Sequence, residues 1–532
     1  MIDLLQAYTL VGDDRFESGF LNTSAPLLPT VHMLKTIDSS NVIRYSFSQF
    51  IQGLNTIRTQ VVQDGLVQSL VTDSRRVFPG AVFFALEGLK TNGNFYIEEA
   101  VDRGAVAIVT EQDLGPRFPR DFIQVEDVRV ALAILAKKIV AYQDQALKLC
   151  AITGTNGKTT VSSLAQHVFS AAGPVGLLGT IHYDLGRRRL PSHRTTPESG
   201  DIFNLLQQMQ SQGCLEAFLE VSSHGIDQKR VYGLQFQEAL FLNLSQDHLD
   251  YHGSMEAYYQ VKKSLFSGGL GRMPLAAVIN ADCAYGARLL AELPTAINTV
   301  SFGFSSHASV QARNVQLFAD HSEFDLYWPQ GQLRVNSPLL GRYNVSNMLA
   351  VCALAWLRGV DLHHVAERIQ SFSGVPGRMQ RVACGQAFNV LVDYAHTADA
   401  LSLASEMLAE MTPGRLIVVF GCGGDRDRTK RSGMLQAAAS RAALVVATAD
   451  NPRSEPLQQI FSDMGGASSE SLYFIEDRKQ AISRALDFAQ PGDCVLVAGK
   501  GHECTQEFAG TVIPFDDCQV IQDLLRLKGY GN

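Results

Sequence analysis

Residues 151–160 are the part of this chain that most constrains its fold. They read Ala-Ile-Thr-Gly-Thr-Asn-Gly-Lys-Thr-Thr and continue an apolar run that begins at Leu149. An apolar run, a glycine turn and a helix-compatible stretch in this order predict a strand, a loop and a helix. Backbone N–H groups converging at such a turn, the positive end of the helix and the lysine form a cradle for phosphate. The segment therefore predicts a nucleotide-binding α/β domain.

Length and composition set the class of protein. With 532 residues, the chain is expected to hold about three domains. A hydrophobic content of 46%, a charged content of 18% and a net charge of -8 are typical of a globular protein that does not bind nucleic acid. The N-terminus lacks a basic region followed by an apolar stretch, and no apolar run is long enough to span a membrane. We therefore expect a cytoplasmic protein without membrane insertion.

Strand-like and helix-like segments divide the chain into four regions. Residues 1–45 show no clear periodicity and are expected to be an extension of unassigned role. Residues 46–147 alternate short apolar segments with helix-like pieces, which predicts a small α/β domain. Residues 148–373 alternate strands with longer helices, which predicts a mostly parallel sheet covered on both faces. In residues 374–532, apolar strands end in polar turns, where open α/β sheets bind ligands.

The glycine loop departs from the common Walker pattern, because two residues rather than four separate Gly154 from Gly157. In this it resembles the loop of the ATP-dependent Mur ligases, a superfamily that includes folylpolyglutamate and cyanophycin synthetases. Further motifs follow in the order typical of the UDP-N-acetylmuramoyl-tripeptide synthetases, which add the third residue of the peptidoglycan stem peptide. These motifs occupy residues 72–80, 195–197, 220–224, 243–253, 341–347, 377–379, 392–397, 421–427, 450–453 and 499–503.

The resemblance implies an α/β fold of three domains. They are a small UDP-binding domain, a central P-loop-type ATPase domain with a mostly parallel sheet, and a C-terminal Rossmann-like domain. It also implies a ligase that uses ATP and Mg²⁺ to join meso-diaminopimelate to UDP-N-acetylmuramoyl-L-alanyl-D-glutamate through an acyl phosphate, and a monomer is expected. The residues that it assigns to ATP are Gly154, Thr155, Asn156, Gly157, Lys158, Thr159, Thr160, Asn347, Arg378, Asp393 and His396.

The same resemblance assigns catalysis to Lys158, Glu220, His248 and Lys262, and Mg²⁺ binding to Thr159, Glu220, His248 and Lys262. Glu220 and His248 each follow a predicted strand, and a carboxylate suits Mg²⁺ better than an imidazole does. Lys262 aligns with a lysine that is carbamylated in this family, a change that turns a cation into an anionic oxygen ligand. The alternative is that Lys262 is one of two adjacent solvated lysines, a role that Lys263 fits better.

Two binding sets complete the assignments that the resemblance implies. Short hydroxyl groups and an arginine suit diphosphate and carboxylate oxygens. The set for the UDP-sugar dipeptide is Ser74, Thr195, Thr196, Ser222, Gln228 and Arg230. The set for meso-diaminopimelate is Arg426, Asp450, Asn451, Arg453, Gly499 and Glu503.

Arg453 is the residue that we expect to select the amino acid substrate. It ends an Asp-Asn-Pro-Arg motif that lysine-adding relatives lack. Its guanidinium offers a planar fork to the distal carboxylate of diaminopimelate, a group that lysine does not possess. The alternative is a plain surface ion pair. The chain departs from the family pattern at Asn92, Thr429 and Ser432, and the segment after Ser454 is one residue shorter.

Two other readings compete with this assignment. Another enzyme of the superfamily is one, although folylpolyglutamate synthetases lack a UDP-binding domain and neither they nor the D-Ala-D-Ala-adding ligase are expected to carry the Asp-Asn-Pro-Arg motif. A non-catalytic nucleotide-binding scaffold is the other. Such a scaffold is expected to have lost Lys158, Glu220, His248 or Lys262, and all four are present.

Overall fold

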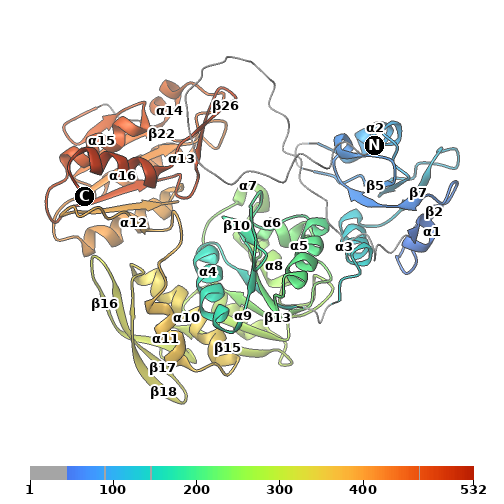
Figure 1. Cartoon of the computed structure of the whole chain (residues 1–532), viewed down its shortest axis with the longest axis horizontal. Helices are drawn as coiled ribbons and strands as arrows, with labels where there is room; N and C mark the ends of the chain where they lie inside the picture. The colour runs from blue at the N-terminus through green and yellow to red at the C-terminus, as the bar shows by residue number, and fades with distance from the viewer. Residues whose placement is uncertain (1–44, 89–90, 144–146, 466–467, 532) are drawn as a thin grey trace, which may run out of the picture. The chain divides into compact units, whose positions relative to one another are not determined.

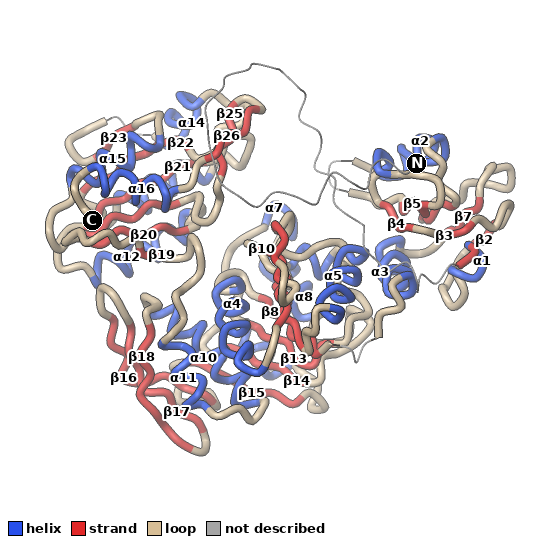
Figure 2. Tube along the Cα trace, viewed as in Figure 1, coloured by secondary structure: helices blue, strands red, loops and turns tan. Residues whose placement is uncertain are grey.

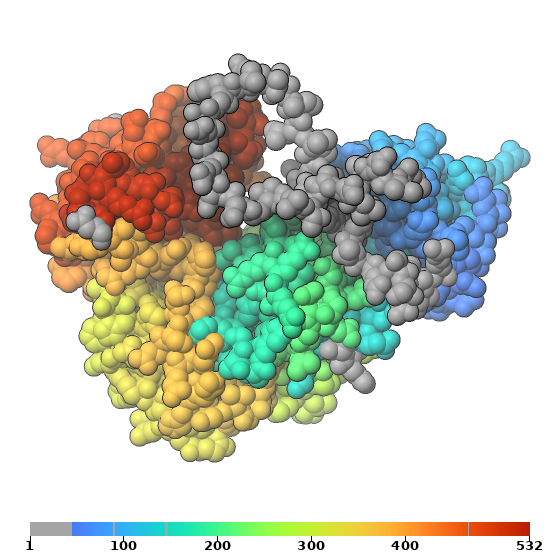
Figure 3. All heavy atoms as spheres, in the orientation of Figure 1, coloured from blue at the N-terminus to red at the C-terminus, as the bar shows by residue number. Residues whose placement is uncertain are grey.

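The computed structural model describes residues 45–88, 91–143, 147–465 and 468–531. Apart from Tyr45, the expected extension 1–45 lies outside the described residues. Three large β-sheets with flanking helices follow one another along the chain (Figures 1 and 2), and side chains fill the gaps that the ribbons leave within each of them (Figure 3). Within the described part of the chain, no helix is both long and apolar enough to cross a membrane.

The first sheet has five strands in the order β2-β7-β6-β5-β4. Strands β4 to β7 pair in parallel and β2 pairs antiparallel to β7. The side chains of β5 are apolar and buried, as the sequence predicts for an inner strand. The elements of this region are β1 (Tyr45–Ser46), α1 (Phe47–Phe50), β2 (Arg58–Gln60), β3 (Leu66–Val67), β4 (Ser69–Val71), η1 (Ser74–Arg76), β5 (Ala81–Phe84), η2 (Gly93–Tyr96), α2 (Ile97–Asp102), β6 (Ala107–Thr110), β7 (Asp121–Gln124) and α3 (Val128–Ile139).

The central sheet has eleven strands in the order β11-β10-β9-β12-β8-β13-β14-β15-β16-β17-β18. The strands from β9 to β16 in this order pair in parallel, which confirms the expected mostly parallel sheet, and antiparallel strands extend both edges. The strands are β8 (Lys148–Thr153), β9 (Val175–Leu178), β10 (His182–Asp184), β11 (Arg189–Pro191), β12 (Glu216–Glu220), β13 (Phe236–Phe241), β14 (Ala276–Asn280), β15 (Asn298–Gly303), β16 (Val310–Leu317), β17 (Ser322–Trp328) and β18 (Gly331–Ser337).

Both faces of the central sheet are covered. Alternate residues of β8 enter two different apolar cores, Ile152 on one face and Leu149 on the other, as the period of a strand requires. Helices α4 and α10 pack on the face of Ile152, and α5 and α8 pack on the opposite face. The helices are α4 (Lys158–Phe169), η3 (Ser170–Ala172), α5 (Ser199–Ser211), α6 (Ser223–Asp227), α7 (Leu249–His252), α8 (Met255–Ser264), α9 (Ala284–Glu292), α10 (Arg342–Leu357) and α11 (Leu362–Gln370).

The third sheet has six strands in the order β19-β20-β24-β21-β22-β23, all parallel except the short edge strand β19. Its inner strands lie where the apolar runs predict them. The elements are β19 (Gln380–Arg381), β20 (Asn389–Asp393), α12 (Ala398–Met411), β21 (Leu416–Cys422), α13 (Lys430–Ala439), β22 (Leu444–Ala449), α14 (Leu457–Met464), β23 (Leu472–Phe474), α15 (Arg478–Phe488), β24 (Cys494–Ala498), the hairpin β25 (Thr505–Phe508) and β26 (Thr511–Pro514), and α16 (Asp517–Leu527).

Candidate active site

The glycine loop joins the carboxyl end of β8 to the first turn of α4, as the sequence predicts. Gly157 occupies the N-cap of α4 with a φ of 88°, a left-handed conformation that favours glycine. The Nζ atom of Lys158 donates to the carbonyl oxygens of Gly154 (2.8 Å) and Thr155 (2.9 Å), so its charge lies over the loop. Burial lowers the pKa of Lys158. The loop thus combines free helix N–H groups with a cation, which suits phosphate.

Asn347 lies against this loop. It belongs to the interior of α10 and is buried, so it is not a helix cap. Its Nδ2 donates to Oδ1 of Asn344 (3.0 Å), and a Cβ atom on Gly157 would overlap its Oδ1. The structure therefore brings two separate motifs together at the nucleotide loop.

Glu220 is the hub of the central site. The residue is 1% exposed, and its carboxylate accepts hydrogen bonds from Thr159 Oγ1 (3.0 Å) and Ser162 Oγ (3.2 Å) of α4. It also accepts from the backbone nitrogen (3.1 Å) and hydroxyl (2.8 Å) of Thr180. Glu220 is the last residue of β12 rather than a residue after the strand, so its backbone is fixed by the sheet. Thr159 and Glu220 together offer the hard oxygen donors that suit Mg²⁺.

Lys262 and Lys263 of α8 have opposite environments. Lys262 is 1% exposed, and its Nζ donates to Thr153 Oγ1 (3.2 Å) and to the carbonyl of Gly154 (3.1 Å) at the base of the glycine loop. Burial lowers the pKa of Lys262 well below its usual value, and the nearby charge of Lys158 adds to the shift. Lys263 instead forms an ion pair with Glu292 at 2.8 Å. The reading of Lys262 as a solvated lysine is therefore wrong.

His248 does not lie directly at a strand end, which corrects the expectation from sequence. Strand β13 ends at Phe241, and His248 is the N-cap of α7 with a φ of 52°. Its ring centroid is 4.8 Å from that of His224, whose pKa burial lowers to about 4. No group of three or more His, Cys, Asp or Glu side chains that could hold a metal ion occurs in the described ranges. Of the four expected Mg²⁺ ligands, the structure joins Thr159 and Glu220 by a hydrogen bond.

A chain of hydroxyl groups connects Glu220 to the residues expected to bind the sugar dipeptide. The hydroxyls of Thr180 and Thr195 are 3.0 Å apart. Thr196 Oγ1 donates to the carbonyl of Glu220 (2.9 Å) and lies 3.1 Å from Ser222 Oγ. Arg230 and Gln228 complete this network, which therefore contains five of the six expected residues.

Arg230 closes that network. Its Nη1 donates to the carbonyl of Thr196 (2.9 Å) and its Nη2 to Oε1 of Gln228 (2.6 Å). Ser74 lies apart from it in η1, where its buried hydroxyl donates to Glu99 Oε2 at 2.7 Å. Asn92, a departure from the family pattern, caps η2 by accepting from the backbone of Asn94 (2.9 Å).

Arg378, Asp393 and His396 surround one tyrosine. The guanidinium of Arg378 lies 4.5 Å above the ring of Tyr394, and its buried Nε has no hydrogen-bond partner in the described part of the chain. The Asp393 carboxylate accepts hydrogen bonds from the backbone nitrogens of Met379 and Ala395, and burial raises the pKa of Asp393. His396 Nδ1 lies 2.8 Å from the Tyr394 carbonyl, and the ring of His502 lies 5.1 Å from the Tyr394 ring at a tilt of 45°. An unpaired buried guanidinium nitrogen suits an anionic ligand.

The residues expected to bind the amino acid gather beyond the carboxyl ends of β21, β22 and β24. Asn451 Nδ2 donates to Glu503 Oε2 (2.9 Å), and the fully buried Lys500 donates to both side chains at 3.3 and 3.2 Å. A Cβ atom on Gly499 would lie 2.8 Å from Oδ2 of Asp450, whose pKa burial raises. Carboxylates and an ammonium group in one enclosed place suit a zwitterion.

Arg453 and Arg426 both lie close to Gly423. A Cβ atom on Gly423 would be 3.1 Å from Nη1 of Arg453 and 3.6 Å from Cγ of Arg426. Arg453 has a φ of 54° and donates from Nη1 to the carbonyl of Gly424 at 2.8 Å. Its Nε lies 3.5 Å from Glu507, and a quarter of its side chain is exposed. The guanidinium of Arg453 thus has two partners, the Gly424 carbonyl and the partly exposed Glu507.

Three residues of the site were not found from sequence, namely Thr180, Tyr394 and Lys500. Thr180 follows the carboxyl end of β9, and Tyr394 and Lys500 follow those of β20 and β24. The rule that ligands bind at these strand ends could have identified all three. The contacts of Thr180 with Glu220, of Lys500 with Asn451 and of Tyr394 with His502 could not have been foreseen, because these partners are distant in sequence.

Family models match all three sheet regions. The Mur ligase family catalytic domain matches residues 66–139, the Mur ligase middle domain residues 152–355, and the Mur ligase glutamate ligase domain residues 377–501. These matches agree with the three-domain α/β fold implied by the sequence motifs.

Individual relatives narrow the assignment. The chain is 43% identical to the UDP-N-acetylmuramoyl-L-alanyl-D-glutamate–2,6-diaminopimelate ligase of Solibacter usitatus, over 87% of this chain and 94% of that protein. It is 41% identical to the enzyme of the same name from Geobacillus thermodenitrificans, over 85% and 93%. A solved structure of a ligase of that name superposes with a TM-score of 0.65 at 34% identity, covering 92% of this chain and all of the other. The chain therefore belongs to the Mur ligases, and among them to the UDP-N-acetylmuramoyl-L-alanyl-D-glutamate–2,6-diaminopimelate ligases.

Proposed function

We propose that the three regions of this diaminopimelate ligase divide the reaction among them. Residues 46–147 bind the UDP end of the acceptor, with Ser74 at the diphosphate. Residues 148–373 bind ATP and carry out phosphoryl transfer. Residues 374–532 bind meso-diaminopimelate. ATP phosphorylates the D-glutamate carboxylate, the amine of the incoming amino acid attacks the acyl phosphate, and phosphate leaves as the amide forms.

The glycine loop, residues 154–160, holds the ATP phosphates. Its backbone N–H groups and Lys158 stabilise the negative charge that develops on the transferred phosphoryl group. Asn347 faces the adenine side of the loop. Arg378, Asp393 and His396 contribute the remaining contacts to the nucleotide, and the unpaired Nε of Arg378 is available to a phosphate oxygen.

Thr159, Glu220, His248 and a carboxylated Lys262 would hold Mg²⁺, which supplies positive charge between crowded phosphate oxygens. The burial of Lys262 and its lowered pKa support carboxylation, since only an unprotonated amine adds to CO₂. In that step the Nζ–C bond forms and one proton is released. The resulting carbamate would add a second anionic oxygen donor to the carboxylate of Glu220.

The observation that carries the proposal is the position of Thr180. Its hydroxyl contacts Glu220, which is bonded to Thr159 of the nucleotide loop, and it contacts Thr195 of the acceptor set. One unbroken series of hydrogen bonds therefore joins the ATP site to the sugar dipeptide site. Such a series positions the acceptor carboxylate beside the phosphoryl group.

The experiment incubates the purified protein with ATP, MgCl₂ and UDP-N-acetylmuramoyl-L-alanyl-D-glutamate, and with meso-diaminopimelate or L-lysine in parallel. Mass spectrometry should show a product with diaminopimelate and one phosphate released per product. Lys158→Ala should abolish the product while circular dichroism shows an intact fold. Product of equal yield from Lys158→Ala would contradict the assignment of the loop.

We further propose that the enzyme works as a monomer in the cytoplasm. Light scattering coupled to size-exclusion chromatography should give the mass of one chain, 58.1 kDa. Fractionation of cells that express the full chain should recover it in the cytosol, and recovery in washed membranes would contradict the location.

A further inference from the structure

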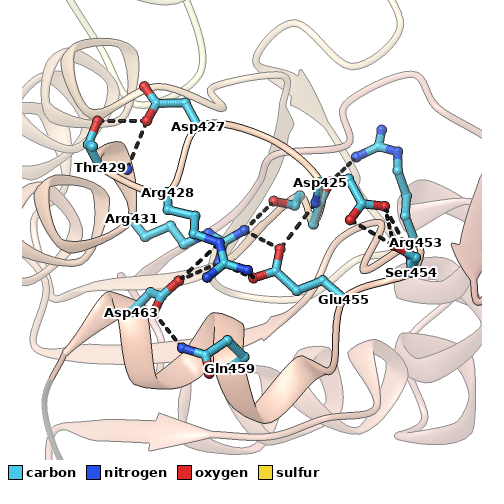
Figure 4. A network of polar contacts seen from close by, with 12 residues as sticks. Asp425, Asp427, Arg428, Thr429, Arg431, Arg453, Ser454, Glu455, Gln459 and Asp463 are labelled. Carbon is cyan, nitrogen blue, oxygen red and sulfur yellow. Dashed lines mark hydrogen bonds and ion pairs between the residues drawn. The ribbon is translucent and has the colours of Figure 1, made fainter.

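A buried ion network joins the two loops that carry Arg426 and Arg453 (Figure 4). At its centre is Arg431 of α13, whose side chain is fully buried. Its Nη1 donates to Oε1 of Glu455 (2.8 Å) and to Asp463 of α14 (2.7 Å), and its Nη2 donates to Oε2 of Glu455 (2.7 Å). The Arg431 guanidinium therefore binds the Glu455 carboxylate through both of its terminal nitrogens.

The network also holds the backbone of the loop after β21. Glu455 Oε2 accepts from the backbone nitrogen of Asp425 at 3.1 Å, and Arg431 Nη2 donates to the carbonyl of Gly423 at 3.2 Å. Arg428, from the same loop, adds a contact to Glu455 Oε1 at 2.9 Å. The Glu455 carboxylate, in the loop after β22, therefore fixes the peptide nitrogen of Asp425, one residue before Arg426.

The two loops meet in an unfavourable backbone conformation. Asp425 and Arg453 both have a φ of 54°, which costs free energy in a residue other than glycine. Ser454 donates from its backbone nitrogen (3.1 Å) and hydroxyl (2.8 Å) to the carboxylate of Asp425. Such conformations persist only where surrounding contacts enforce them. At Asp425 these contacts come from Ser454 and from the neighbouring Glu455. At Arg453 the backbone nitrogen donates to the Glu507 carbonyl (3.0 Å) and the backbone carbonyl accepts from Ala509 (2.6 Å), while Glu455 closes the turn by donating from its backbone nitrogen to the Pro452 carbonyl (3.1 Å).

We propose that Glu455 and Arg431 are positioning residues that set the guanidinium groups of Arg453 and Arg426 for the distal end of diaminopimelate. This inference rests on the proposed assignment of those two arginines to the amino acid. Glu455 and Arg431 are buried and paired with each other, so their proposed role is exerted through the two arginines. They act by fixing the backbone of Asp425, one residue before Arg426, and the turn after Pro452 that contains Arg453, so losing the pair lets the guanidinium groups leave the orientation that the ligand requires.

The first test measures KM and kcat for Glu455→Gln with each of the three substrates. Glutamine keeps the shape and one acceptor but loses the ion pair. We expect the KM for meso-diaminopimelate to rise about tenfold or more, while the KM values for ATP and the UDP-sugar dipeptide stay within about twofold of wild type. Arg431→Lys, which keeps the charge but loses the fork, should shift the same KM and serves where Glu455→Gln folds poorly.

Asp493→Asn is the matched control. Asp493 is as buried as Glu455, pairs with Arg415 at 2.7 Å, and accepts from the Arg415 backbone nitrogen at 2.8 Å. It lies just before β24, at the opposite end of the sheet from the pocket. Asp493→Asn should lower the Tm as Glu455→Gln does, yet leave the KM for diaminopimelate unchanged. A purely structural role for Glu455 predicts the same kinetics for both variants, and that result would overturn the proposal.

A double-mutant cycle separates this inference from the function on which it rests. If Glu455 acts through Arg453, then adding Glu455→Gln to Arg453→Ala should raise the KM for diaminopimelate by less than about half of its effect in the wild type. Fully additive effects would reject the positioning role. An Arg453→Ala enzyme with wild-type KM would reject the assignment of Arg453 itself, while an affected Arg453→Ala beside an unaffected Glu455→Gln would reject only the inference.

Discussion

Gly157 and Asn347 lie against each other at the nucleotide loop, where a Cβ atom on the glycine would overlap Oδ1 of the asparagine. Gly157 also has a φ of 88° at the N-cap of α4. A side chain here is therefore excluded twice, by backbone conformation and by contact. The absence of a Cβ atom lets α10 approach the loop that carries Lys158.

Gly157→Ala should impair ATP binding. The left-handed conformation costs an alanine about 1–2 kcal/mol, and the overlap with Asn347 must displace the loop or α10. We expect the KM for ATP to rise about tenfold or more. Gly213→Ala is the control, since Gly213 has a φ of 86° with no atom within 4 Å of its added Cβ. Gly213→Ala should lower the stability without changing the KM for ATP. An equal change in the KM for ATP in both variants would show that the contact with Asn347 does not matter for ATP binding.

Lys262→Ala and Lys263→Ala should separate the two neighbouring lysines. Lys262 is buried beneath the glycine loop, so its loss should leave almost no activity. If the carbamate supplies the missing oxygen ligand, acetate should restore part of it. Lys263→Ala breaks only the ion pair with Glu292 and should stay close to wild type, because surface pairs contribute about 0–1 kcal/mol. Equal activity of both variants without acetate would contradict the carbamate.

The sequence predicted the inner strands well, because an inner parallel strand is a short apolar run that is easy to recognise. Strand β14 (Ala276–Asn280) contains most of the apolar run that ends at Ile279. The position of His248 was predicted wrongly, since the chain between β13 and α7 turns through a left-handed residue that no local pattern reveals.

Contacts between distant segments lay beyond prediction from residues alone. The opposite environments of Lys262 and Lys263 depend on which face of α8 packs on the sheet, and adjacent residues of a helix point about 100° apart. The link from Glu220 through Thr180 to Thr195 likewise joins three strand ends whose order in the sheet differs from their order in the chain.

Arg358 should be among the most important residues for stability in the central region. Its side chain is mostly buried and forms ion pairs with Glu216 at 2.6 Å and Glu238 at 2.9 Å. Arg358→Ala leaves both carboxylates enclosed without a partner, which typically costs about 3–5 kcal/mol. Urea unfolding should show this loss, whereas Arg313→Ala, at an exposed residue of β16, should change stability by less than about 1 kcal/mol. Similar losses of unfolding free energy in Arg358→Ala and Arg313→Ala would show that the buried ion pairs of Arg358 do not contribute more than an exposed arginine does.

The stability contributed by Glu455 should depend on pH. Arg431 lowers the pKa of Glu455 from 4.5 to about 2 in the folded protein. The folded state therefore binds the proton more weakly than the unfolded state, so the contribution is complete above pH 4.5 and is lost as the pH falls toward 2. The difference in unfolding free energy between wild type and Glu455→Gln should shrink through that window. A difference that stays constant from pH 7 to 3, in steps of about one unit, would contradict the depressed pKa.

Arg453→Ala should change the affinity for diaminopimelate selectively. The guanidinium lies beside Gly423 and donates to the Gly424 carbonyl, with a quarter of the side chain exposed. Its removal deletes a charge-assisted contact to the distal carboxylate and leaves that carboxylate without a cation. Such a loss costs about 2–5 kcal/mol, or about 30- to 4,000-fold in apparent affinity. The KM values for ATP and the UDP-sugar dipeptide should stay near wild type, because those ligands contact other residues.

The substrate preference of the wild type is a second test of the role of Arg453 in specificity. L-Lysine brings no distal carboxylate, so it leaves the guanidinium of Arg453 without its anion and should be used very poorly. In Arg453→Ala both amino acids lack a cationic partner, so the preference for meso-diaminopimelate should fall mainly through weaker use of that substrate. Competition assays scored by product mass give this ratio directly. Equal use of the two amino acids by the wild type would show that Arg453 does not set the specificity.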